Sequence, residues 1–138
     1  MGTWDTGPFD NDNAADWCGE LHDANSAVRP DLVREALARA ADEEDYLECH
    51  AAEEAIAAAA LAASQRTGGP SMNSAYAPEF LRSGGSLDLP DDIAPLAVRA
   101  LDRILGEDSE WRKLWDESPD AGAAAVAVLA DLRVLLSA

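Results

Sequence analysis

Basic residues are scarce in this chain. Its 138 residues hold 10 Lys and Arg against 27 Asp and Glu, which gives a net charge of −17. Binding to nucleic acids or to anionic membrane surfaces depends on clustered Lys and Arg, so we expect neither partner. A charge of this size instead favours attraction to a basic surface, on a protein or on a cationic small molecule.

Cysteine and long apolar runs are also rare. The longest apolar run covers residues 55–63, far short of the ~20 residues that a membrane-spanning helix needs. The first ten residues lack the basic and apolar regions of a signal peptide. We therefore expect a cytoplasmic protein whose two cysteines, Cys18 and Cys49, are reduced thiols.

The alternation of apolar and polar residues that is typical of a half-buried strand is missing from the sequence. Apolar residues recur at helical spacing instead, in segments separated by turn and capping residues. We therefore predict an all-α protein, a single-domain compact bundle of about six helices over residues 1–138. The predicted helices cover residues 13–24, 30–41, 45–65, 91–105, a short segment around 111–115, and 120–136.

The segment 45–65 is predicted to be the central helix. It contains neither Gly nor Pro and is dominated by alanine, the residue with the highest helix propensity. Because alanine side chains are small, neighbouring helices can approach closely. We therefore expect the other helices to be arranged around this segment.

The first twelve residues do not follow a helical pattern. Gly2, Gly7 and Pro8 disfavour regular structure, so residues 1–12 are predicted to be an irregular arm. Trp4 and Phe9 are its two large apolar anchors.

A second irregular stretch covers residues 66–90, which hold two Gly-Gly pairs and three prolines. Loops of this length are uncommon inside a compact domain and are functional or disordered more often than short ones. Its aromatic residues between the glycines are Tyr76 and Phe80, and we expect them to pin the loop to the body of the protein.

The opening MGTWDTGPFDNDNAADW is similar to that of the domain-of-unknown-function 4259 family, small bacterial proteins that commonly begin MGTWGTGPFDND. The resemblance continues through DLVREALARAADEEDYLE, AAEEAIAAAALAASQ and LPDDIAPLAVRALDRILGEDSEW, and so covers most of the chain. Two departures are visible: Asp5 stands where the family usually has Gly, and Ala59 and Ala60 extend an alanine run that often contains a Glu. The resemblance implies no activity, because no general function is attached to the family.

The complete inventory of Cys and His has the two-plus-two count of a structural zinc site: Cys18, His22, Cys49 and His50. Adjacent helical residues such as Cys49 and His50 point about 100° apart, and the spacings of known zinc sites are absent. Cys18 and His22 could form a nucleophilic dyad by spacing, but the acidic residues around them raise a thiol pKa rather than lower it. We expect no metal ion, no cofactor and no catalytic residue.

Acidic residues gather before and within the predicted central helix, at Glu43, Glu44, Glu48, Glu53 and Glu54. No Glu-x-x-His pair accompanies them, so a di-iron site is not supported. We interpret this group as a solvated helix face. If the protein binds a polar or cationic ligand, the candidate contacts are Glu53, Glu54 and Tyr76.

Two of the four tryptophans lie shortly before the last predicted helix. Trp111 and Trp115 are four residues apart, and their rings suit either a cap on the core or an anchor in a protein interface. The helix predicted over 120–136 is apolar almost all round. It is therefore either buried on several sides or half of an intermolecular interface.

These features favour a non-catalytic module that binds another protein with a basic surface, in a hetero-oligomer rather than a homo-oligomer. It would be an accessory or stabilising subunit, for example of a biosynthetic enzyme, or an inhibitor of the immunity type. Two alternatives stay open: a small-molecule-binding protein with a pocket between helices, and an enzyme that acts through paired carboxylates. The expected partner contacts are Trp4, Phe9, Tyr76, Phe80, Trp111 and Trp115.

Overall fold

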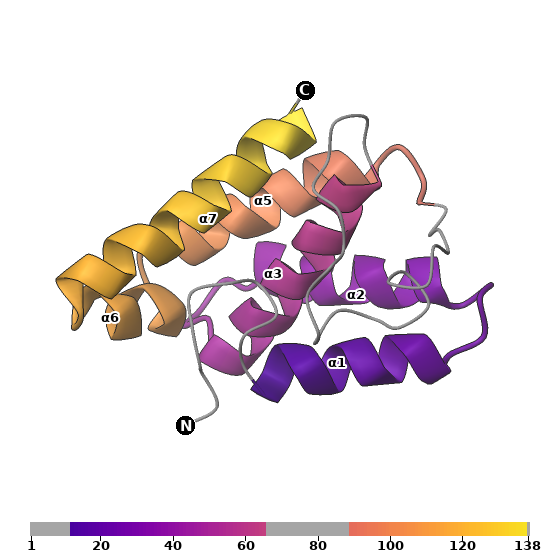
Figure 1. The fold of residues 1–138 in the computed structure, drawn as a ribbon, viewed down its shortest axis with the longest axis horizontal. Helices are drawn as coiled ribbons and strands as arrows, with labels where there is room; N and C mark the ends of the chain where they lie inside the picture. Colours follow the sequence, from indigo (N-terminus) through magenta and orange to yellow (C-terminus); the bar gives the residue numbers. More distant parts are fainter. Residues whose placement is uncertain (1–11, 66–88, 138) are drawn as a thin grey trace.

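The structure, a computed structural model, describes residues 12–65 and 89–137 (Figure 1). Within these ranges the chain is helical and forms no sheet, so the all-α prediction is confirmed. The predicted arm, apart from Asp12, and residues 66–88 of the predicted loop lie outside the described residues. The described helices are α1 (Asp12–Asp23), α2 (Arg29–Ala41), α3 (Cys49–Ser64), α5 (Ile93–Leu105), α6 (Glu110–Asp116) and α7 (Pro119–Ser137).

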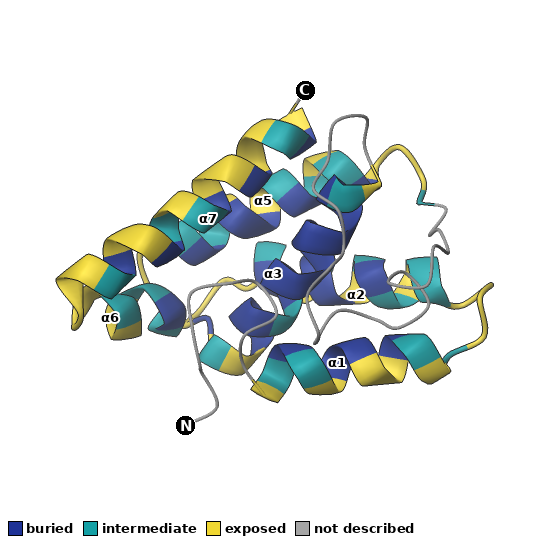
Figure 2. Ribbon diagram, in the orientation of Figure 1, coloured by how far each residue is buried: buried dark blue, intermediate teal, exposed yellow. Residues whose placement is uncertain are grey.

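Helix α3 is the centre of the bundle. It packs against α1, α2, α5, α6 and α7, which are all the other helices of the described ranges (Figure 1). Twelve of its sixteen residues are buried, and Figure 2 shows most of the helix in the colour of buried residues. The central position predicted for this alanine-rich segment is therefore confirmed.

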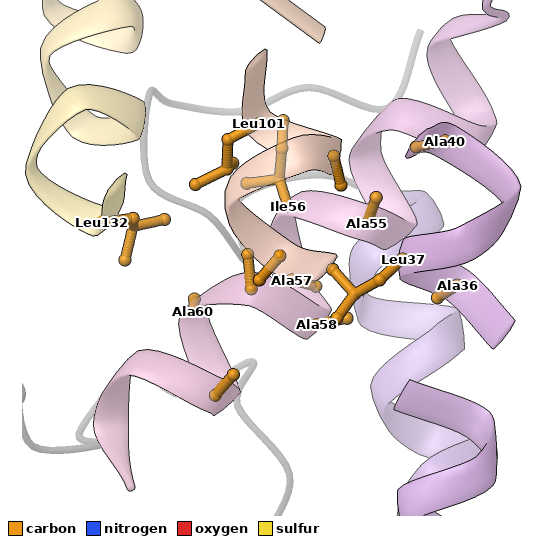
Figure 3. Packing of buried hydrophobic residues seen from close by; sticks show 14 of the residues in the cluster. Ala36, Leu37, Ala40, Ala55, Ile56, Ala57, Ala58, Ala60, Leu101 and Leu132 are labelled. Carbon is orange, nitrogen blue, oxygen red and sulfur yellow. The ribbon is translucent and has the colours of Figure 1, made fainter. Parts of the chain in front are cut away.

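Alanine makes this packing possible. Figure 3 shows larger side chains of the neighbouring helices, Leu37 of α2, Leu101 of α5 and Leu132 of α7, arranged around the small side chains of α3. Helix axes approach to 8–10 Å, depending on the side chains at the contact. With alanine on one side of each contact, several helices fit around one axis, and the buried hydrophobic residues form one cluster.

The start of α3 differs from the prediction, which placed it at residue 45. The backbone N–H of Leu47 donates to the carbonyl oxygen of Asp108 at 2.8 Å, and the Leu47 carbonyl oxygen accepts from the N–H of Glu110 at 2.9 Å. These bonds hold Leu47 in a parallel bridge with Ser109. Since the backbone groups of Leu47 are used across the chain, the helix begins only at Cys49.

One arginine holds the two connectors that form this bridge. The guanidinium of Arg103, on α5, donates to the backbone carbonyl oxygens of Glu43 and Asp45 on one connector and of Glu107 and Asp108 on the other. A guanidinium has five N–H donors in a fixed plane, so it can satisfy several carbonyl groups at once. The connectors that precede α3 and α6 are thereby fixed to the same point of α5.

Several helices begin or end at a proline, glycine or serine, residues that are typical of helix ends. Pro30 lies in the first turn of α2, Gly106 ends α5, and Pro119 begins α7. The hydroxyl oxygen of Ser109 accepts a hydrogen bond from the backbone N–H of Arg112, so it caps α6. Each of these residues acts within about one turn of its helix, proline through its fixed φ angle and Ser109 through its capping hydroxyl, so the signals are local in the sequence.

Replacing Gly122 by alanine is expected to destabilise the protein by about 1–3 kcal/mol, because it overpacks a buried contact. A Cβ at this position of α7 would lie 2.4 Å from the backbone oxygen of Trp115, which cannot move aside as a side chain can. The measurement is the free energy of unfolding from urea titration.

The matched control is Gly19→Ala on α1, where an added Cβ meets nothing within 4 Å. Because Gly is a poor helix former, this change is expected to stabilise the protein by up to about 1 kcal/mol. Equal effects of the two substitutions would contradict the packing of α7 against α6.

Candidate functional site

The predicted partner contacts fall into two groups. Trp4, Phe9, Tyr76 and Phe80 lie outside the described residues. Trp111 is 4% exposed and belongs to the core, while Trp115 is half-buried and packs against it. Their ring centroids are 6.2 Å apart with the planes tilted by 55°. This placement favours the first of the two predicted roles, a cap on the core, and the contact role stays a prediction.

Glu53 corrects the expectation of a solvated acidic face. Glu53 is only 6% exposed, and one of its carboxylate oxygens accepts a hydrogen bond from the side-chain amide of Asn13, on α1, at 2.8 Å. A buried carboxylate is stable only with such partners. The helical pattern missed this burial because the residues that cover Glu53 come from a different helix.

The thiol of Cys49 lies beside Glu53 at the start of α3. Burial, the negative charges of Glu53 and Glu110, and a hydrogen bond to Glu53 raise the pKa of Cys49 to about 12. Its backbone N–H donates to the Glu110 carboxylate at 2.7 Å. Burial alone raises the pKa of Cys18 to about 12, whereas the sequence suggested acidic neighbours as the cause. At neutral pH both groups are thiols, which are weak nucleophiles.

Glu54 is the neighbour of Glu53 in sequence but faces another part of the bundle. Its carboxylate lies 3.2 Å from the Arg39 guanidinium of α2 and 3.0 Å from Nε2 of His50. Only 16% of its side chain is exposed. Successive helical residues point about 100° apart, so these two carboxylates contact different helices and do not form one pair.

Glu54 lines a cleft in the region where α1 and α2 both pack on α3. Its volume is about 240 Å³. Of its lining residues, only Glu54 was among the predicted site residues. Trp17, Glu20, Glu35 and Arg39 could not be assigned from sequence, because each has the ordinary spacing of its own helix and only the packing brings them together. The full lining is Trp17, Glu20, Leu32, Glu35, Ala36, Arg39 and Glu54.

Helix α7 is buried on one side only. The buried positions follow one another at intervals of three and four residues: Gly122, Ala125, Leu129, Leu132 and Leu136. The opposite side is exposed along the whole helix (Figure 2). Of the two predicted states of this helix, burial on several sides is wrong in the structure, and the role as half of an intermolecular interface stays a prediction.

Metal and membrane sites are not indicated in the described ranges. Among residues 12–65 and 89–137, no three Cys, His, Asp or Glu residues form a group that could hold a metal ion. The two cysteines and two histidines therefore do not gather as a zinc set. In the same ranges no helix combines the length and the apolar character needed to cross a bilayer.

Comparison with known proteins gives one match. The model of a family described as a domain of unknown function, DUF4259, matches residues 2–127. Neither the curated proteins nor the solved structures contain a match to the chain.

Replacing Glu53 by Gln is expected to lower the pKa of Cys49 and to speed its reaction with a thiol reagent at pH 8. The substitution removes a negative charge that favours the neutral thiol and replaces one carboxylate oxygen, a hydrogen-bond acceptor, by an amide NH₂ group. Cys18 owes its raised pKa to burial, so its labelling rate should not change. Peptide mapping by mass spectrometry measures both rates in one sample, and equal acceleration at the two cysteines would indicate general loosening instead.

The unfolding free energy is expected to fall as the pH rises above 9. The two thiols have raised pKa values of about 12 in the folded protein, against an ordinary 9.0, so the folded state holds their protons where the unfolded state releases them. Their contribution is fully present below pH 9 and is lost as the pH rises toward 12. Replacing Cys49 by Ser should make the decline less steep in urea titrations, and an identical decline would contradict the raised pKa.

Proposed function

The chain belongs to the domain-of-unknown-function 4259 family, whose description assigns no activity, and we propose that it is a protein-binding subunit whose exposed face of α7 docks on a partner. The observation that carries this proposal is the apolar character of that face. Val134 is 69% exposed, and it lies in a row of small residues on the outer side. This row, the outer row of α7, consists of Ala123, Ala127, Ala130, Val134 and Ser137.

The outer row has the geometry of a helix-packing seam. Its members are spaced by four, three, four and three residues, as in the buried row on the other side of α7. This is the interval at which one helix packs along another. Leu114 of the adjacent α6 is a further exposed apolar residue, with 45% exposure. Large exposed apolar patches on a protein surface mark interaction sites.

Charge supports a foreign partner rather than a second copy. The outer row itself carries no charge, and two charged residues of α7 flank it: the exposed Asp131, and Arg133, which is paired with Asp102 of α5 at 2.7 Å. The chain as a whole carries −17, so two copies repel each other while a basic partner is attracted. We therefore propose a hetero-oligomer with a basic protein that offers an apolar helix.

The role of such a subunit depends on which surface of its partner it covers. By occupying an apolar surface of its partner it either stabilises that partner, as an accessory subunit of an enzyme does, or blocks a functional face, as an inhibitor does. The two free cysteines suit the reducing cytoplasm, which we propose as its location.

The test replaces Ala127 and Ala130 by Lys in the tagged protein, which is then purified from its native host with whatever co-elutes. Two long cationic side chains in the outer row should abolish co-elution of a stoichiometric partner, because they hold off its helix and repel a basic surface. Folding should be unaffected, since both positions are exposed. Light scattering gives the stoichiometry, and mass spectrometry identifies the partner.

The control is a double variant with the same charge change on another surface, Gly19→Lys with Ala27→Lys. Both positions are exposed, on α1 and in the connector after it. It should retain the partner. Loss of the partner in both variants would show that overall charge, not the face of α7, governs binding. A wild-type protein that elutes alone as a monomer would remove the proposal.

A further inference from the structure

We draw no further inference here: the strongest candidate, the cluster of the Cys49 thiol, the buried Glu53 carboxylate and the Asn13 amide where α1 meets the start of α3, carries nothing, because its hydrogen bonds join its own members and nothing else in residues 12–65 and 89–137 points to a ligand there.

Discussion

Close packing of five helices against one alanine-rich helix is the constraint on which the rest of the structure depends. The distance between two packed helices is set by the side chains at their contact. Alanine on nearly every side of α3 lets larger residues of the surrounding helices fill the space, as Leu37, Leu101 and Leu132 do (Figure 3). A larger side chain on α3 would displace a neighbour, because protein interiors have little free volume.

The polar residues near the start of α3 determine how the first two helices sit. Glu53 is tied to Asn13 of α1 and Glu54 to Arg39 of α2. Because partly buried carboxylates need partners, each of these bonds favours one placement of its helix on α3. The cleft lies between α1 and α2 in these positions. The helix packing that orders the bundle therefore also brings its carboxylates together.

Two surfaces of the molecule, on either side of α3, differ in polarity and charge. One is the outer row of α7, which is uncharged and, apart from Ser137, apolar in a protein of charge −17. The other is the acidic cleft between α1 and α2. Neither surface gathers a nucleophile with a base, and both thiols have pKa values of about 12.

The sequence by itself determined the all-α class, the central helix, and the ends of helices at Pro30, Gly106 and Pro119, because propensity and capping act within one or two turns. Only the tertiary structure decided where α3 begins, that Glu53 is buried, which side of α7 is exposed, and which residues line the cleft. These features depend on contacts such as that between Cys49 and Glu110, 61 residues apart. Helical periodicity shows which residues share a face, but the neighbour that covers that face is chosen by packing between distant segments.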